Sequence, residues 1–199
     1  DRRQRQMCIR DRYKMVERTK IVSLLKAEHP VDEVLLKGWV RTRRDAKDFS
    51  FIEVNDGSCL KNIQVIANNT LNNYEEIKKI TTGASVYVKG ALVESKGGSQ
   101  RYEVVASEIG IYGLAGDDYP LQKKKHTDEY LRTIAHLRPR TNKYGAAFRI
   151  RSELSFAIHK FFNERGFRYV HTPLITGSDC EGAGAMFRGT TLDMENPPK

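Results

Sequence analysis

Basic and aromatic side chains that could bind a nucleic acid lie close together early in the chain. Phe49 and Phe51 are two residues apart on a predicted strand, so both rings point to one face, where they could stack on bases. Gln64, on the next predicted strand, could present its amide to a base edge. Basic residues just before the two rings could follow the phosphates: Arg41, Arg43, Arg44 and Lys47. From the pattern alone, burial of both rings in a hydrophobic core is an equally good interpretation.

The three cysteines do not indicate a zinc site, a disulfide framework or a catalytic nucleophile. Cys8, Cys59 and Cys180 are scattered and form no C-x-x-C pair, which argues against a structural zinc or a disulfide framework. No general base lies near Cys180 in the sequence, so a nucleophilic role is not expected there. We expect no bound metal and a reducing, cytoplasmic location.

The elements that must position these residues begin with an all-β segment. Hydrophobic alternation and turn signals predict five strands, with helices before the first strand and between the third and fourth. Five strands with that intervening helix are typical of an OB-fold barrel, whereas a sandwich needs about seven. The predicted helices span 18–27 and 72–80, and the strands span 34–41, 49–55, 63–67, 84–93 and 102–112.

The second half of the chain is predicted to be mainly helical. A polar linker is followed by a short helix at 128–137 and a long one at 142–165, on which Ile150, Leu154 and Phe161 form an apolar stripe. Gly166 is the expected helix stop, and 167–171 is predicted as a strand that leads into Pro173. Such a stripe must be buried, against another subunit or against the rest of its own domain.

Composition is that of a water-soluble globular protein: 39% of the 199 residues are hydrophobic, 30% are charged and the net charge is +9. No run of residues is apolar enough to span a membrane. The Arg-rich residues 1–14 could be a transit peptide, but a translated artefact with Met15 as the true start is favoured. The remaining charge permits nucleic-acid binding without requiring it.

Two groups of motifs carry a family resemblance. GWVRTRRD, FSFIEVNDGS and NIQVIAN resemble the anticodon-binding barrel of the aspartyl, asparaginyl and lysyl class II aminoacyl-tRNA synthetases. The later stretch FFNERGFRYVHTPLITGSDCEGAGAMFR resembles their first signature motif and amino-acid-binding loop. The resemblance implies an OB-fold barrel followed by the start of a catalytic domain, which is an antiparallel sheet with helices.

The resemblance assigns anticodon contacts to four residues. Phe51 would stack on the central anticodon uridine, which Arg44 and Gln64 would also contact. Glu103, on the fifth strand, would help to read a neighbouring base. Gly38 and Trp39 are expected to be architectural, Gly38 at a strand bend and Trp39 in packing.

In the second domain the resemblance places Pro173 at a dimer interface and Glu181 on the α-ammonium of the amino-acid substrate. A carboxylate pairs with an ammonium group through charge-assisted hydrogen bonds, and glycines at 177, 182 and 184 would let the loop open and close. Ser178 and Asp179 are expected to shape the loop.

The loop and its flanks favour the asparaginyl branch, of bacterial type. The implied partners are tRNA(Asn), asparagine and a second subunit, and the implied cofactors are ATP and Mg²⁺. Their main binding residues lie downstream in the family, so we expect no catalytic residue in this fragment and no activity from it alone. Alternatives are an aspartate–tRNA ligase, one that also charges tRNA(Asn), a non-catalytic OB module, and a paralogue that makes a small metabolite. The expected organisation is a leader at 1–14, an anticodon-binding barrel at 15–112, a linker at 113–140 and the truncated catalytic domain at 141–199.

Overall fold

The computed structural model describes residues 17–98, 100–116, 118–173, 175, 189, 191 and 195. The predicted leader, Glu181 and most of the amino-acid-binding loop lie outside the described residues. The chain divides into two compact units, residues 1–152 and 153–199.

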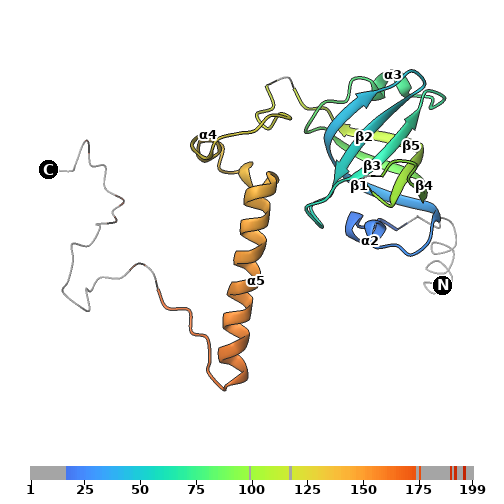
Figure 1. Ribbon diagram of the computed structural model, residues 1–199. Helices are drawn as coiled ribbons and strands as arrows, with labels where there is room; N and C mark the ends of the chain where they lie inside the picture. The colour runs from blue at the N-terminus through green and yellow to red at the C-terminus, as the bar shows by residue number, and fades with distance from the viewer. Residues whose placement is uncertain are drawn as a thin grey trace, which may run out of the picture. The chain divides into compact units, whose positions relative to one another are not determined.

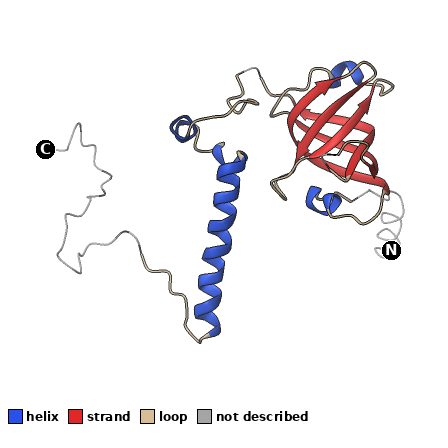
Figure 2. Ribbon diagram, viewed as in Figure 1, coloured by secondary structure: helices blue, strands red, loops and turns tan. Residues whose placement is uncertain are grey.

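The first unit holds a closed five-stranded barrel with the strand order β1-β2-β3-β5-β4 (Figure 1). All neighbouring strands pair antiparallel except β3 and β5, which pair parallel. This is the predicted OB-fold architecture, and Figure 2 shows that every described strand belongs to it. The strands are β1 (Val31–Asp45), β2 (Phe49–Asn55), β3 (Ile63–Asn68), β4 (Ser85–Glu94) and β5 (Tyr102–Gly113).

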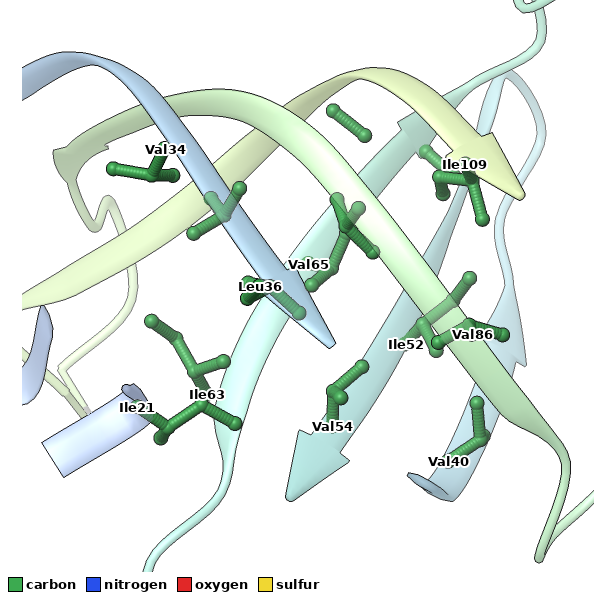
Figure 3. Packing of buried hydrophobic residues seen from close by; sticks show 14 of the residues in the cluster. Ile21, Val34, Leu36, Val40, Ile52, Val54, Ile63, Val65, Val86 and Ile109 are labelled. Atoms are coloured by element: carbon green, nitrogen blue, oxygen red, sulfur yellow. The ribbon is translucent and has the colours of Figure 1, made fainter. Parts of the chain in front are cut away.

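Strict alternation of side chains fills the barrel. On β2, Ile52 and Val54 point inward, and on β3, Ile63 and Val65 do the same (Figure 3). Each such side chain contributes roughly 1.5–3 kcal/mol when it leaves water. The outward positions between them are then free to carry binding groups.

Two glycines allow backbones to approach closely where β1 and β4 meet their neighbours. A Cβ at Gly38 would lie 2.6 Å from the Asn55 carbonyl oxygen, and one at Gly90 would lie 2.1 Å from the Val105 carbonyl oxygen. The architectural role expected for Gly38 is therefore one of close packing against β2.

The two helices beside the barrel are shorter than predicted. α2 (Ile21–Leu25) and α3 (Tyr74–Ile77) replace the predicted 18–27 and 72–80. Each buries only two side chains, Ile21 and Leu24 in α2, and Tyr74 and Ile77 in α3. Because short helices are stabilised mainly by the face they bury, the flanking residues follow turns instead.

The linker region folds into α4 (Asp128–Thr133) and a 3₁₀ turn at Arg138–Arg140 (Figure 2). The Thr127 hydroxyl accepts a hydrogen bond from the Tyr130 N–H and caps α4. This helix ends earlier than the predicted residue 137, because the backbone of Ile134 leaves the helical region with φ −116° and ψ 46°.

The long predicted helix is confirmed as α5 (Asn142–Glu164), and Gly166 follows it with φ +86°. Its apolar residues are exposed: Leu154 and Ile158 each keep 58% of their accessible surface. The predicted strand at 167–171 is wrong. Those residues are exposed, and no described strand pairs with them, whereas a strand requires a hydrogen-bonded neighbour.

Candidate nucleic-acid interface

The outer face of β1 and β2 presents aromatic rings beside a guanidinium group. Phe49 and Phe51 make an edge-to-face contact with ring centroids 4.9 Å apart. Arg44 lies directly across from Phe51 in the β1–β2 ladder, and its guanidinium carbon is 6.0 Å from the ring centroid. Both rings are half-buried, while the core positions of β2 are Ser50, Ile52 and Val54. Core packing of the two phenylalanines is thus wrong, and their face is available to a base.

Gln64 and Glu103 meet on the neighbouring strands. The Gln64 amide nitrogen donates to Glu103 Oε2 at 2.9 Å, and the Ser95 hydroxyl donates to the same oxygen at 3.1 Å. Glu103 is 5% exposed, which leaves it little room to touch a ligand directly. Gln64 is less buried and lies opposite Glu53 in the β2–β3 ladder, two positions from the pair of Phe51 and Ile66.

A polar groove runs past Gln64. Its lining includes Glu53, Asn62, Gln100 and Arg101, which offer hydrogen-bond donors and acceptors. The ring, the amide and this groove together match the requirements of a base-binding surface.

Two of the four basic residues near Phe49 and Phe51 bind other groups of the protein. Arg43 bonds the Ile77 carbonyl at 3.0 Å and pairs with Asp45 at 3.1 Å. Arg41 donates to the Arg140 carbonyl at 2.8 Å. Arg44 and Lys47 are exposed, so these two are the cations free to meet phosphates.

Trp39 packs as expected, but outside the core. It keeps 42% of its accessible surface, and the guanidinium of Arg140 lies 4.9 Å from its ring centroid. The tryptophan therefore holds the 3₁₀ turn against the barrel by a cation–π contact.

A second cluster of rings and cations, on β4 and β5, is internally neutralised. Glu108 accepts hydrogen bonds from Lys89 at 2.8 Å and from the Tyr87 hydroxyl at 2.5 Å. The hydrogen bond from Lys89, with that from Tyr87, holds the pKa of Glu108 below its usual value. The carboxylate offsets the cation, so this face is less attractive to a polyanion than the face that carries Arg44 and Phe51.

The remaining predicted sites are far less defined. Pro173 is exposed, and Glu181 lies outside the described residues. Lys123, Lys124 and Lys125 are exposed as well. Within the described part of the chain, no group of three or more His, Cys, Asp or Glu residues is placed to hold a metal ion. No described helix is both long and apolar enough to cross a membrane.

Sequence reasoning missed Ser95, which precedes the β4–β5 loop. Only the pairing of β4 with β5 indicates that Ser95 lies near Glu103. Val93 lies opposite Glu103, and the Ser95 N–H donates to the Arg101 carbonyl at 2.9 Å. That hairpin register brings the Ser95 hydroxyl to the buried carboxylate.

Comparison with known proteins agrees with this geometry. Residues 34–112 match the family model for the OB-fold nucleic acid binding domain of the tRNA anticodon type. Residues 127–193 match the model for class II tRNA synthetases of the D, K and N group. The chain belongs to the class II aminoacyl-tRNA synthetases.

Two curated relatives in this synthetase family are asparagine–tRNA ligases. The asparagine–tRNA ligase of Geotalea uraniireducens is 56% identical over 184 residues, which are 92% of this chain and 40% of that protein. The asparagine–tRNA ligase of Oleidesulfovibrio alaskensis is 61% identical over 178 residues, 89% of this chain and 39% of the relative. The chain thus spans about 40% of the length of these relatives.

Solved synthetase structures share the fold. Asparaginyl-tRNA synthetase from Pyrococcus horikoshii matches with a TM-score of 0.71 at 23% identity, over 81% of this chain and 39% of that one. A putative aspartyl-tRNA synthetase from Leishmania major matches with a TM-score of 0.68 at 20% identity, over 82% of this chain and 35% of that one. The fold alone therefore does not separate the asparaginyl branch from the aspartyl branch of the family.

Proposed function

We propose that this chain is the tRNA-binding part, and the start of the catalytic domain, of an asparagine–tRNA ligase. The observation that carries the proposal is the outer-face arrangement of Arg44, Phe51 and Gln64, with Glu103 behind the amide, on a barrel that matches the anticodon-type family model. Identities of 56% and 61% to asparagine–tRNA ligases support the asparaginyl branch over the aspartyl one.

The proposed organisation follows from the same observations. Residues 15–112 form the anticodon-binding domain, 113–140 the linker and 141–199 the beginning of the catalytic domain. In the whole enzyme, asparagine would attack the α-phosphorus of ATP to give asparaginyl-adenylate and pyrophosphate. A terminal ribose hydroxyl of tRNA(Asn) would then displace AMP. Positioning and charge stabilisation would supply most of the rate enhancement.

Within this chain, Phe51 would stack on a base and Arg44 would add a positive charge above the same ring. Glu181 would bind the asparagine ammonium group, and Pro173 would lie at the subunit interface of a homodimer. We place the enzyme in the cytoplasm. ATP and Mg²⁺ serve class II synthetases generally, but the described residues offer no carboxylate cluster for the metal. No step through either cofactor is assigned to this chain.

Binding of the 199-residue chain to RNA tests the proposal. The probes are tRNA(Asn), the same tRNA with its central anticodon uridine replaced, and tRNA(Asp), each at two salt concentrations. We expect replacement of the uridine to weaken binding, and Phe51→Ala to cost about 1–3 kcal/mol, because a stacked base is lost. Preference for tRNA(Asn) over tRNA(Asp) would support the asparaginyl branch.

Tyr112→Ala is the matched control, since Tyr112 is a 59% exposed ring elsewhere on the barrel. Equal and strongly salt-dependent binding to all three RNAs would instead indicate simple phosphate attraction and a non-catalytic binding module.

A further inference from the structure

The buried carboxylate of Glu103 decides which end of the Gln64 side-chain amide faces inward. Glu103 can have this effect without contacting a base itself. A carboxylate accepts hydrogen bonds and donates none, whereas the two ends of a glutamine amide differ, one donating and one accepting. Because Gln64 Nε2 lies 2.9 Å from Glu103 Oε2, the nitrogen end of the amide must face inward. The flipped amide would set two acceptors against each other.

Burial makes this orientation strongly preferred. Glu103 is 5% exposed, so water cannot readily replace the Gln64 donor. Ser95 donates to the same oxygen at 3.1 Å and restricts the carboxylate in turn. Losing a partner at a buried charged group costs more than losing one at the surface.

The oxygen end of the Gln64 amide is left to face outward. Among the described residues, no hydrogen bond reaches Gln64 Oε1, and the polar groove lies beside it. An acceptor held there, next to the Phe51 ring, complements a base whose Watson–Crick edge has an imino N–H. Uracil and guanine have one, whereas cytosine N3 and adenine N1 are acceptors.

We infer that Glu103 is a positioning residue that fixes the Gln64 amide with its oxygen outward, so that the site selects a base with an imino N–H. The inference rests on the proposed function and deepens it. Glu103 acts through Gln64, without needing to touch the RNA.

The test compares two anticodon stem-loops of tRNA(Asn) that differ only in uridine or cytidine at the central position. The full 199-residue chain is used with Glu103→Gln, which keeps the side-chain shape but can both donate and accept. We expect the uridine-to-cytidine affinity ratio to fall by about 10-fold, the size of one lost hydrogen bond between the Gln64 amide and the base. Cytidine binding should rise while uridine binding falls, because the flipped amide can donate to cytosine N3.

Glu108→Gln is the matched control. It removes the same charge from another carboxylate on β5, but Glu108 accepts from Lys89 and from the Tyr87 hydroxyl on a different face of the barrel. Both loops should bind it slightly more tightly, with the affinity ratio unchanged. A second readout needs no RNA: the Gln64 side-chain amide protons should show slow hydrogen exchange in the wild-type chain and faster exchange in Glu103→Gln.

An unchanged ratio in Glu103→Gln, when the wild type prefers uridine, would overturn the inference and leave the proposed function intact. Equal loss of affinity for both loops would also overturn it, since that is the result of a purely structural role. A wild-type chain that binds both loops equally would overturn the proposed function together with the inference.

Discussion

Asp56 accepts a hydrogen bond at 3.0 Å from the backbone N–H of Ile21, which lies 35 residues earlier in the chain. The adjacent Val22 N–H bonds the Ser58 hydroxyl at the same distance, and Ser58 in turn bonds Asp56. α2 has no side-chain cap of its own at Lys20. The turn after β2 therefore caps the helix that precedes β1.

Replacing Asp56 should destabilise the barrel. Its side chain is 1% exposed and also pairs with Arg18 at 3.5 Å. For Asp56→Ala we expect a loss of about 1–2 kcal/mol, the usual cost of removing a helix cap. Urea denaturation followed by circular dichroism measures it. Asp32→Ala, at an exposed carboxylate on β1, is the control and should stay within about 0.5 kcal/mol of wild type.

The same carboxylate should make stability depend on pH. Burial raises the pKa of Asp56, but hydrogen bonds from Ser58 and from the Ile21 N–H outweigh it, so the pKa lies below its usual value. A lowered folded-state pKa means that the stabilisation is present above the unfolded pKa, near 4. It is lost as the pH falls through the folded value.

Denaturation midpoints measured between pH 6 and pH 2 should therefore decline less in Asp56→Asn than in the wild-type chain. Parallel declines of the two proteins would show that Asp56 is not a source of the acid sensitivity.

The contact between Trp39 and Arg140 can be read by fluorescence. Trp39 is the one tryptophan in the sequence, so its emission reports only this site. Arg140→Ala should shift that emission to longer wavelength and cost roughly 0.5–1 kcal/mol, the worth of an exposed cation–π contact. Arg138→Ala is the matched control, because Arg138 stacks on Tyr144 and Phe148. Identical spectra for wild type and Arg140→Ala would contradict the contact.

Gly90→Ala should disturb the barrel where β4 crosses β5. The new methyl group would meet the Val105 carbonyl oxygen at 2.1 Å, and backbone cannot rotate away as a side chain can. We expect a loss of about 1–3 kcal/mol in thermal or urea denaturation. Gly98→Ala, with nothing within 4 Å of its Cβ position, should be close to neutral. Equal stability of the two variants would mean that β4 and β5 do not approach so closely.

The exposed apolar face of α5 should promote self-association. Ile150 and Leu154 keep 60% and 58% of their accessible surface. Contiguous apolar surface of this kind favours association in water. Sedimentation velocity of the 199-residue chain should show concentration-dependent oligomers, and Leu154→Glu with Ile158→Lys should reduce them. A monomer at every concentration would show that this face needs no partner.

Local patterns predicted much of this molecule. Alternation on β3 indicated the inward Ile63 and Val65 and the outward Gln64, and alternation on β2 placed Phe49 and Phe51 on one face without deciding whether that face is buried. A period of two residues is a property of any extended strand, so it can be seen without the fold. α5 was predicted for the same reason, with a period near 3.6 and a glycine stop.

Short helices and the strand at 167–171 were less predictable. α2 and α3 depend on what their few buried residues touch, and their ends were missed by several residues. The predicted strand failed because a strand is stabilised by a hydrogen-bonded neighbour, which periodicity cannot identify.

By itself, the sequence determined the barrel class, the shared face of Phe49 and Phe51 and the synthetase family, whereas the structure decided that this face points outward. Only the tertiary structure decided which groups meet: Gln64 with Glu103, 39 positions apart, Asp56 with the start of α2, and Arg41 and Arg43 with backbone carbonyls instead of solvent. The physical reason is that periodicity and turn chemistry act over a few residues. Hydrogen-bond partners across a closed barrel are set by strand register and by the need to satisfy each buried polar group.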